Sequence, residues 1–369
     1  MRILLVGPFP PYRGGISMFN HSLSQELQKD HEVHRISFSL QYPKLLFPGN
    51  TQYSDFNGEP ASESINSVNP LSWRKTANDI NKIYPDLIIF QYWMPFFAPA
   101  FTSIAKRLKK SCDAKIIVNC HNITAHEPKP WDNQMTKSFF SYCDGFMVMS
   151  NTVEEDLKAI QPNPKYKRSP HPIYDVFGDS VDKDKARNSL GLGLENVILY
   201  FGLIRDYKGL DILLHSAKLL KKRMKDFKIL VAGECYGNKN KYIQMAEENN
   251  IMDIIDFRFD FVPNEKVNQY FCASDLVVLP YKSATQSGVV PIAYHFDKPV
   301  VVSNVGGLHE IVEEGKSGYV CDPTPEGISE MILKFFNEDA AQFTEFVSKY
   351  KQNFTWTNYT NVLMELADL

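Results

Sequence analysis

The sequence predicts two α/β domains, each built around a parallel β-sheet. At 369 residues the chain exceeds the length at which a single hydrophobic core usually stops growing. Short apolar runs recur along the chain, and segments with helical spacing of apolar residues lie between them. An alternation of strands and helices over the whole length is typical of parallel sheets with right-handed crossover connections.

The apolar runs predict strands that are buried on both faces, as the central strands of parallel sheets are. The runs are residues 3–6, 87–90, 116–118, 146–149, 197–201, 229–232, 276–279 and 300–302. Between them, apolar side chains recur with helical spacing after residue 209. That helix face consists of Leu210, Leu213, Leu214, Ala217 and Leu220. These patterns place a helix directly after the fifth predicted strand.

A proline-containing break separates the two domains. Pro170 and Pro172 exclude both a helix interior and a central strand, and a charged stretch follows at residues 182–187. We place the interdomain linker in this region. The N-terminal domain then comprises residues 1–170, and the C-terminal domain comprises residues 171–354.

Two further segments bear on this organisation. Residues 45–69 are rich in Pro, Gly, Ser and Asn without periodicity, and they are expected to form a long surface loop. The last segment, residues 355–369, has the apolar spacing of a helix, with Tyr359, Leu363 and Leu366 on one face.

Composition excludes several classes of protein. Hydrophobic residues at 44% and charged residues at 22% are close to the averages of soluble globular proteins. A net charge of −3 provides no basic surface for nucleic acid, so we expect no nucleic-acid partner. The six cysteines show no CxxC spacing and mostly fall in or beside apolar runs, so we expect reduced core residues rather than metal ligands or disulfides.

The sequence also limits contact with membranes. The apolar start at residues 1–6 is too short for a signal-peptide core, and no stretch reaches about 18 uninterrupted apolar residues. We therefore expect a cytoplasmic protein, with any membrane contact peripheral, at the inner membrane face. The aromatic-rich segment 90–97 would provide such a contact if it is exposed, and would pack the interior if it is buried.

Turns that follow predicted strands are candidate sites, because ligands of open α/β sheets bind at the carboxyl ends of the strands. The first such turn carries Gly14 and Gly15 at the start of a helix, where backbone N–H groups can approach an anion. It lacks the GxGxxG dinucleotide fingerprint, which argues against a dehydrogenase. The alternative is a turn that needs glycine only for a positive φ.

A second turn runs from Gly202 to Gly209 and contains Arg205 and Lys208. Two cations between a buried strand and a helix could hold a diphosphate, a leaving group that needs positive charge as its bond to a sugar breaks. The alternative is a solvated loop, in which both charges simply face water.

Two more turns carry polar residues. Gln286, Ser287 and Gly288 offer N–H groups and side chains that suit phosphate or sugar oxygens, whereas Ser287 alone could act as a helix N-cap. His121 and Asn122 follow another predicted strand, in a turn that continues to residue 127, and could hydrogen-bond a sugar or polarise a nucleophile. The alternative for His121 is a structural hydrogen bond.

Together these turns resemble the retaining glycosyltransferases of family 4. The resemblance also includes residues 261–264 and 298–318, and it extends over nearly the whole chain. It implies the GT-B fold, with two Rossmann-like domains whose parallel sheets face each other across a cleft. It also implies transfer of a sugar, with retention of anomeric configuration, from a nucleotide-diphosphate sugar to a glycan, lipid-linked or small-molecule acceptor, as in polysaccharide biosynthesis.

The resemblance further implies roles for single residues. The C-terminal domain would hold the donor, with Arg205 and Lys208 on the diphosphate, while His121 would lie beside the transferred sugar. The remaining donor-binding residues would be Gly14, Gly15, Gly202, Val262, Gln286, Ser287 and Gly288. No metal or other cofactor is expected, because the departing phosphate takes the acceptor's proton and is stabilised by cations and N–H donors. The C-terminal helix would pack back on the N-terminal domain.

The sequence departs from the family pattern in two places. The family's paired glutamates, which are separated by seven intervening residues, are replaced by Ala284 and Ile292, and the usual arginine after the glycine of the diphosphate turn is Leu203. Two interpretations therefore stay open. Either the residues around Arg205 and Gln286 take over the roles of the missing glutamates and arginine, or the chain is a catalytically silent homologue that binds a nucleotide sugar or a partner enzyme.

Overall fold

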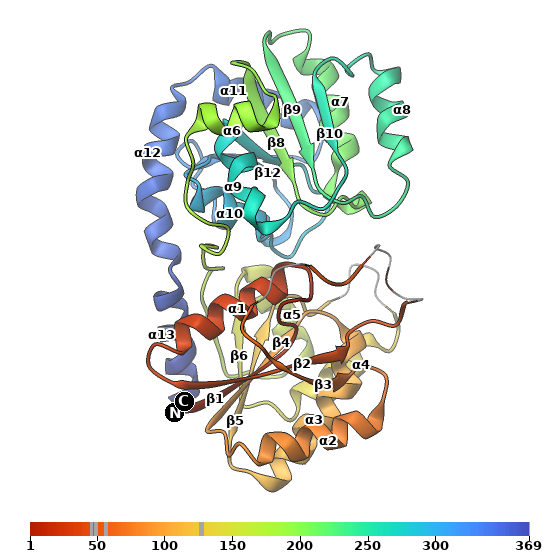
Figure 1. Cartoon of the computed structure of the whole chain (residues 1–369), viewed down its shortest axis with the longest axis vertical. Helices are drawn as coiled ribbons and strands as arrows, with labels where there is room; N and C mark the ends of the chain where they lie inside the picture. Colours follow the sequence, from red (N-terminus) through yellow and green to blue (C-terminus); the bar gives the residue numbers. More distant parts are fainter. Residues whose placement is uncertain (45–46, 48–50, 55–57, 125–128, 369) are drawn as a thin grey trace. The chain divides into compact units, whose positions relative to one another are not determined.

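The computed structural model describes residues 1–44, 47, 51–54, 58–124 and 129–368, which form two compact units (Figure 1). The N-terminal unit comprises Met1–His171 together with Trp356–Leu369, and the C-terminal unit comprises Pro172–Thr355. Each unit contains one sheet, and all the paired strands in both sheets are parallel.

The sheet of the N-terminal unit has the strand order β3-β2-β1-β4-β5-β6-β7. Its strands are β1 (Arg2–Val6), β2 (Glu32–Leu40), β3 (Ser62–Asn66), β4 (Leu87–Tyr92), β5 (Lys115–Cys120), β6 (Gly145–Val148) and β7 (Tyr166–Arg168). The central strand β4 is buried along its whole length, and it pairs with β1 on one side and β5 on the other. The carboxyl ends of these three strands therefore lie side by side.

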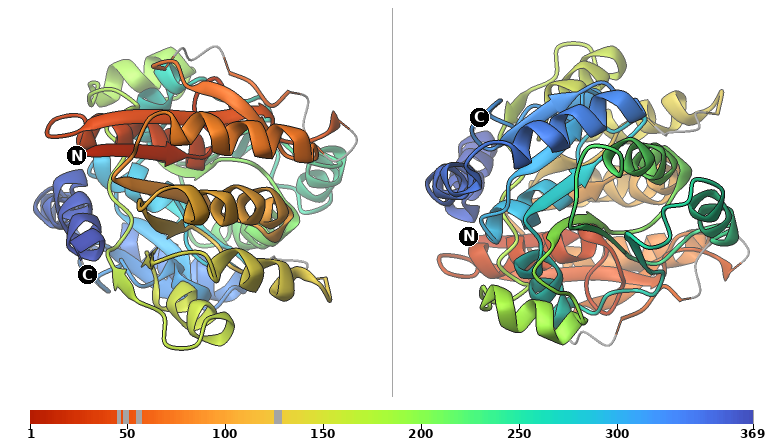
Figure 2. Two further views of the ribbon diagram at one scale, coloured as in Figure 1. Left: turned by 90° about the horizontal axis from the view of Figure 1, so that it is seen from below. Right: turned by 90° about the horizontal axis from the view of Figure 1, so that it is seen from above.

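Helices cover both faces of this sheet (Figure 2). They are α1 (Gly15–Leu27), α2 (Pro70–Asn81), α3 (Ala98–Ser111), α4 (Asp132–Phe140), α5 (Asn151–Ile160) and α13 (Trp356–Asp368), with a 3-10 turn η2 (Pro95–Phe97) before α3. The C-terminal helix α13 packs on α1, as Figure 1 shows, and also contacts β6 and β7. The Thr357 hydroxyl donates a hydrogen bond to Glu26 of α1 across 2.7 Å, and Lys115 Nζ donates to the Ala367 carbonyl across 2.6 Å.

The sheet of the C-terminal unit has the strand order β10-β9-β8-β11-β12-β13. Its strands are β8 (Asn196–Phe201), β9 (Phe227–Ala232), β10 (Ile255–Arg258), β11 (Leu276–Leu279), β12 (Val300–Ser303) and β13 (Gly318–Cys321). Strand order reverses between β8 and β11, which is the place where open α/β sheets usually bind ligands.

The helices of the C-terminal unit form two groups, with α7, α8 and α11 in one group and α6 and α9 packed together in the other. The helices are α6 (Lys183–Leu190), α7 (Leu210–Leu220), α8 (Asn240–Glu248), α9 (Asn264–Ala273), α10 (Val289–His295), α11 (Pro325–Phe336) and α12 (Ala340–Tyr350). Short 3-10 turns are η3 (Asp206–Lys208), η4 (Gly306–Leu308) and η5 (Lys351–Phe354). The predicted apolar face of α7 is fully buried.

All eight apolar runs form strands, but two expectations about the less apolar segments are wrong. The segment 45–69, expected as a loop, contains β3, whose residue Ile65 is buried while its neighbours are mostly polar; residues 45–46, 48–50 and 55–57 of that segment lie outside the described residues. The charged stretch 182–187 is not all linker, because α6 begins at Lys183. The Asp182 side chain caps this helix by accepting a hydrogen bond from the Lys185 N–H across 3.0 Å.

Candidate functional site

Turns at the carboxyl edge of the C-terminal sheet are joined to one another by backbone hydrogen bonds. They follow β9, β8, β11 and β12, which are neighbours in the sheet. The bonds run from Ile204 N–H to Glu234 O (2.9 Å), from Lys282 N–H to Tyr207 O (2.7 Å) and from Gly307 N–H to Thr285 O (3.2 Å). The edge is therefore one connected backbone surface.

Glycines allow these turns to approach so closely. Gly209 has a φ of 68°, and a side-chain carbon there would overlap the carbonyl oxygen of Pro280. Gly306 has a φ of 48°, and a side-chain carbon there would overlap the carbonyl oxygen of Ala284. Both positions require glycine for its conformation and for its lack of Cβ.

Arg205 and Lys208 lie in the turn after β8, and within the described residues neither forms an ion pair with a carboxylate. The Arg205 guanidinium lies 5.0 Å from the ring centroid of Tyr236, and Lys208 Nζ lies 5.3 Å from that of Tyr281. Burial lowers the pKa of Lys208 below its usual value. A half-buried ammonium group without a counter-ion costs folding free energy, so this turn is electrostatically suited to an anion.

The carboxylate in the same turn is compensated by a different cation. Asp206 forms an ion pair with Lys241 and accepts a hydrogen bond from the Tyr242 hydroxyl across 3.3 Å. The bond from Lys241 holds the pKa of Asp206 below its usual range. The positive charges of Arg205 and Lys208 are therefore not cancelled by the acid that lies between them in sequence.

The turn after β11 contains three more of the predicted donor-site residues. Ser287 Oγ accepts a hydrogen bond from the Val289 N–H across 3.2 Å and lies 3.3 Å from the Tyr281 hydroxyl. The alternative interpretation of Ser287 as a capping residue is thus partly met, although the N-cap position itself is Gly288. Gln286 and Ser287 are both half-buried.

The last two residues predicted for this unit lie at the same sheet edge. Gly202 directly follows β8 with a φ of 103°, and a side-chain carbon there would lie 3.4 Å from Lys208 Nζ. Val262 follows β10 and is buried. The structure thus gathers the predicted cations with Gly202 and the turn after β11, whereas Gly14, Gly15 and His121 belong to the N-terminal unit.

In the N-terminal unit, Gly14 and Gly15 are exposed at the start of α1. Gly14 is the N-cap residue with a φ of 116°, and a side-chain carbon there would meet nothing within 4 Å. Gly14 thus has the positive φ that the conformational alternative requires. The N-cap residue Gly14 has no side chain that could cap α1, and the first turn of the helix contains no acidic residue that would compete with an anion.

His121 ends a chain of buried polar groups that we call the polar relay, formed by the Pro8 carbonyl and the side chains of Asn20, Gln91 and His121. The Asn20 amide donates to the Pro8 carbonyl across 3.2 Å, and the Gln91 amide donates to Asn20 Oδ1 across 3.1 Å. His121 Nε2 lies 2.7 Å from Gln91 Oε1. The relay connects the turn after β1, helix α1, strand β4 and the end of β5.

Backbone hydrogen bonding and aromatic packing also hold His121 in place. The His121 N–H donates to the Tyr92 carbonyl across 2.8 Å, and the Phe19 ring meets the imidazole edge-on, with ring centroids 4.8 Å apart. Burial, and then the neighbouring His171, lower the pKa of His121 to about 3. The ring is therefore neutral near pH 7. Residues 125–128 of the predicted turn lie outside the described residues.

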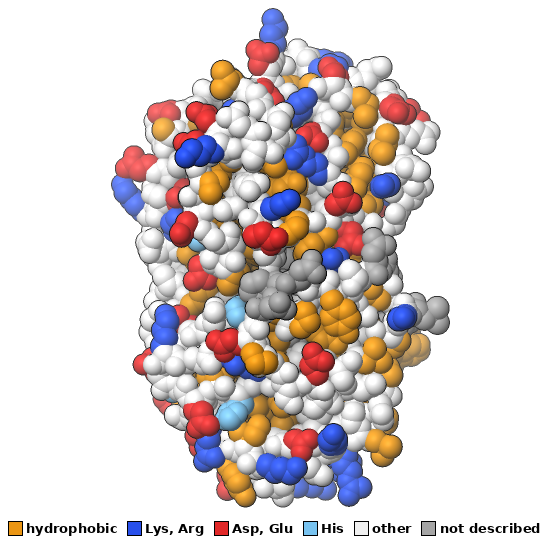
Figure 3. Space-filling view, in the orientation of Figure 1, with side chains coloured by type: hydrophobic (Ala, Val, Ile, Leu, Met, Phe, Trp, Pro, Cys, Tyr) orange, Lys and Arg blue, Asp and Glu red, His pale blue; other side chains and the backbone are white. Residues whose placement is uncertain are grey.

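The aromatic segment 90–97 is mostly interior. Phe90, Tyr92 and Phe97 are fully buried, while Trp93 and Phe96 are half-buried. On the face shown in Figure 3, basic and acidic side chains are interspersed over each unit. Within the described residues, no helix is long and apolar enough to cross a membrane. Contact with a membrane surface and a cytoplasmic location remain predictions.

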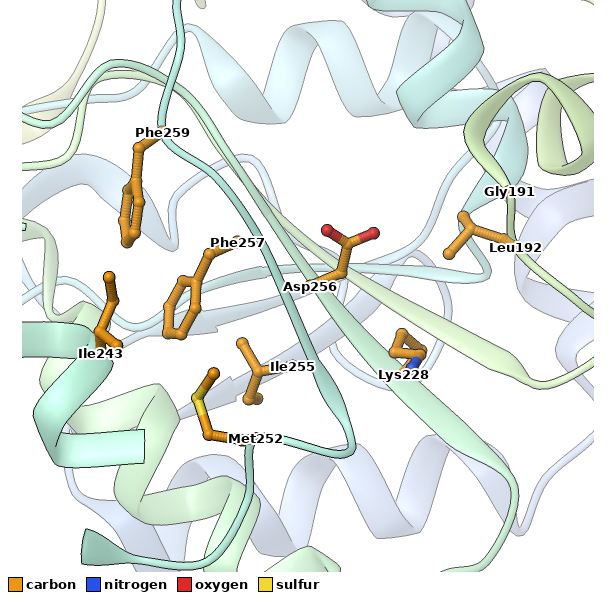
Figure 4. A pocket seen from close by; sticks show the side chains of 9 residues that line it. All are labelled: Gly191, Leu192, Lys228, Ile243, Met252, Ile255, Asp256, Phe257 and Phe259. Carbon is orange, nitrogen blue, oxygen red and sulfur yellow. The ribbon is translucent and has the colours of Figure 1, made fainter. Parts of the chain in front are cut away.

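A pocket of about 430 Å³ wraps around the edge strand β10, but it contains none of the predicted site residues (Figure 4). Ile255, Phe257 and Phe259 line it on one side of the strand, and Asp256 and Lys228 on the other. In the part of the chain that the structure describes, no cluster of three His, Cys, Asp or Glu residues could hold a metal ion.

Two Rossmann-like units, each with one parallel sheet, match the GT-B fold of solved glycosyltransferases. Residues 182–354 match the family described as glycosyl transferases group 1, and residues 13–171 match the family described as Glycosyltransferase Family 4. These matches confirm the resemblance that the turns indicated. The chain belongs to the group 1 glycosyltransferases of family 4.

Curated relatives carry the same general description. A D-inositol 3-phosphate glycosyltransferase of Corynebacterium urealyticum is 31% identical over 195 residues, a match that covers 50% of this chain and 45% of that protein. An uncharacterized glycosyltransferase of Methanocaldococcus jannaschii is 24% identical over 96% of this chain and 95% of its own length. The chain thus matches about half the length of the inositol-phosphate relatives.

Solved structures share the fold at low identity. Anabaena HepE, solved in complex with UDP, has a TM-score of 0.79 at 16% identity, with all of both chains covered. Sucrose-phosphate synthase from Thermosynechococcus elongatus has a TM-score of 0.76 at 16% identity, covering 99% of this chain and 98% of that one.

Sequence reasoning missed the inner members of the polar relay. Asn20 and Gln91 are fully buried polar residues, the first on helix α1, which also buries four other polar side chains, and the second inside a strand. The available signal was Gln91, which directly follows the apolar run 87–90, together with Asn119 at the same level of the neighbouring strand.

Proposed function

We propose that this protein transfers a sugar from a nucleotide-diphosphate sugar to a glycan, lipid-linked or small-molecule acceptor, with retention of anomeric configuration. The observation that carries the proposal is the pair of cations at the carboxyl edge of the C-terminal sheet, Arg205 and Lys208, neither of which forms an ion pair within the described residues. In the proposed reaction these cations hold the diphosphate and stabilise its negative charge as the bond to the sugar breaks.

The proposal assigns roles to the other predicted residues. The turn after β11, with Gln286, Ser287 and Gly288, contacts sugar or phosphate oxygens, and backbone near Val262 lines the base. Gly14 and Gly15 offer N–H groups to the phosphates, and His121 lies beside the transferred sugar. The reaction needs no metal or other cofactor, because cations and N–H donors stabilise the leaving group and the departing phosphate accepts the acceptor's proton.

One observation favours a second candidate, a catalytically silent homologue that binds a nucleotide sugar or a partner enzyme. Ala284 and Ile292 stand where the family pattern has its paired glutamates, and both are buried, with 8% and 7% of their surface exposed. Neither side chain can hydrogen-bond a sugar or a ribose hydroxyl. Binding would then rest on the cations, without the carboxylates that the family pattern places around the transferred sugar.

The test is a titration of the purified protein with UDP-, GDP-, ADP-, CMP- and dTDP-sugars. Binding is measured by thermal shift and by calorimetry. Uridine donors come first, because HepE was solved with UDP and with UDP-glucose. One nucleotide class is expected to raise the melting temperature. Lys208→Met, which keeps the aliphatic stem and removes the charge, is expected to weaken binding about tenfold to a hundredfold.

Lys334→Met is the matched control, because Lys334 Nζ also lies over a tyrosine ring, that of Tyr319 at 4.4 Å, outside the strand-end turns. If wild type and Lys208→Met bind the nucleotide equally well, then Lys208 is not part of the donor site. Binding without turnover across many acceptors would favour the silent homologue, and the anomeric configuration of the product would decide retention.

A further inference from the structure

We infer that Gln91 and Asn20 are positioning residues that hold His121 as a single neutral tautomer, with the proton on Nε2 and a lone pair on Nδ1. The part of this inference that concerns the sugar rests on the proposed function. The relay itself belongs to the N-terminal unit alone, since Pro8, Asn20, Gln91 and His121 all lie there.

The direction of every bond in the relay follows from its first member. The Pro8 carbonyl can only accept, so the amide nitrogen of Asn20 must face it, which turns Asn20 Oδ1 toward Gln91. Gln91 must then present its amide nitrogen to Asn20 and its Oε1 to His121. Because Oε1 only accepts, His121 Nε2 must carry the proton.

The contact with Asn119 is compatible with this orientation of Gln91. Asn119 Nδ2 donates to Gln91 Oε1 across 3.3 Å, so this oxygen receives hydrogen bonds from both Asn119 and His121. If the Gln91 amide were turned around, its oxygen would face Asn20 Oδ1, and two acceptors would then lie against each other. All these side chains are buried, so such mismatches would not be relieved by water.

A glycine makes room for the relay. At Gly7, directly after β1, a side-chain carbon would lie 2.8 Å from Gln91 Cγ and 3.1 Å from Asn20 Nδ2. Gln91 Cγ lies in the middle of its side chain and Asn20 Nδ2 is hydrogen-bonded to the Pro8 carbonyl, so both atoms would have to shift. Gly7 is thus a residue whose replacement disturbs the relay without removing any of its polar groups.

The tautomer decides what His121 can recognise. A lone pair on Nδ1 accepts a hydrogen bond, which suits a sugar hydroxyl and does not suit a phosphate oxygen, because that oxygen also only accepts. Burial keeps the ring neutral, since the pKa of His121 is lowered to about 3. In this tautomer, Nδ1 of His121 would act neither as a phosphate ligand nor as a proton donor.

The tautomer is measured directly by long-range ¹H–¹⁵N correlation of the imidazole nitrogens in histidine-labelled full-length protein at pH 7. The His121 signals are assigned by their loss in His121→Gln. We expect a protonated Nε2 and a bare Nδ1. A protonated Nδ1 would overturn the inference whether or not the protein turns over any donor, so this outcome is separate from failure of the proposed function.

Variants test whether the relay positions the ring for the reaction. Gln91→Met removes the acceptor of Nε2–H, and is expected to broaden His121 into a mixture of tautomers and to lower kcat about tenfold to a hundredfold. The affinity for the free nucleotide should change less than about twofold. A mixture of tautomers with unchanged kcat would refute the positioning role.

Should Gln91→Met fail to fold, Gly7→Ala carries the same test, with the same expected loss of a single tautomer. Its control is Gly145→Ala, because a side-chain carbon at Gly145 crowds only an apolar side chain, Leu366 at 3.0 Å. The control should retain both the tautomer and kcat. Equal losses in Gly7→Ala and Gly145→Ala would mean that crowding of the unit, and not the relay, controls the rate.

Discussion

The carboxyl edges of the two sheets are built in different ways. In the N-terminal unit, side chains connect the edge, because Asn20, Gln91 and His121 are buried, neutral and hydrogen-bonded in series. In the C-terminal unit, the backbone connects the edge through hydrogen bonds between turns, and the side chains of Arg205 and Lys208 carry positive charge that no ion pair within the described residues compensates.

The two edges therefore have different physical properties: one fixes the orientation of hydrogen-bonding groups, and the other carries positive charge. A satisfied buried relay stabilises one arrangement of its members and thereby fixes the direction of a hydrogen bond. An uncompensated cation costs stability in the free protein and regains it when an anion binds. The N-terminal edge is thus suited to direct a neutral group, and the C-terminal edge to bind a charged one.

The largest effect is expected where the backbone itself forms the edge. Gly209→Ala should lower the free energy of unfolding of the C-terminal unit by about 3 kcal/mol or more, because the new Cβ overlaps the Pro280 carbonyl and the residue must keep a positive φ. Gly14→Ala should cost only about 1–2 kcal/mol, because its Cβ meets no atom within 4 Å.

Urea unfolding with two probes distinguishes these variants. All four tryptophans, Trp73, Trp93, Trp131 and Trp356, belong to the N-terminal unit, so their fluorescence follows that unit while far-UV circular dichroism follows both. Gly209→Ala should shift the dichroism transition more than the fluorescence transition. If Gly14→Ala costs as much as Gly209→Ala, then close backbone contact does not distinguish the two edges.

The next effect is an acid sensitivity of the N-terminal edge. The pKa of His121 is about 3 in the folded protein and about 6.5 in an unfolded chain, so the unfolded state binds the proton first as the pH falls. The stability that depends on a neutral His121 is present above about pH 6.5 and is lost toward pH 3. We expect a loss of about 2 kcal/mol at pH 5 relative to pH 7.

Urea unfolding followed by tryptophan fluorescence at pH 5 and pH 7 measures this loss, and His121→Gln should abolish most of it. A pH slope that is unchanged in the variant would assign the acid sensitivity to other groups. It would also mean that His121 is less firmly neutral than its buried position indicates.

The sequence was sufficient to predict the central strands of both sheets but not the strands near the sheet edges. Central strands such as β4 and β8 are apolar on both faces and therefore stand out in the sequence. Strands nearer the edges, such as β3 and β10, expose polar or half-buried side chains and resemble loops. Their strand structure depends on a neighbouring strand that the local sequence does not reveal.

The candidate site divides in the same way. Arg205, Lys208 and the glycines of their turn could be predicted, because they occupy one short segment after an apolar run. Asn20 and Gln91 could not be predicted, because they are 71 residues apart in the sequence. Their hydrogen bond forms only when the fold brings α1 and β4 together. Local spacing reveals charge at a turn, whereas a relay of neutral side chains requires the tertiary structure.

The smallest expected effect concerns Tyr281, whose ring lies under Lys208 and whose hydroxyl lies 3.3 Å from Ser287 Oγ. Burial raises the pKa of Tyr281 to about 12, so its hydroxyl is neutral and contributes no charge. Tyr281→Phe keeps the ring and should change nucleotide affinity less than about threefold, since it removes one long hydrogen bond. Tyr281→Leu removes the ring and should weaken binding further, because Lys208 then loses its cation–π contact.

Calorimetric titration of both variants with the nucleotide that binds wild type decides between ring and hydroxyl. Equal losses in Tyr281→Phe and Tyr281→Leu would show that the hydroxyl, through Ser287, positions the turn after β11. The C-terminal edge would then also depend on a side-chain hydrogen bond, as the N-terminal edge does, and the contrast between a side-chain edge and a backbone edge would no longer hold. A loss confined to Tyr281→Leu would place the contribution in the contact between the aromatic ring and the cation, which is the arrangement expected of an edge organised around charge.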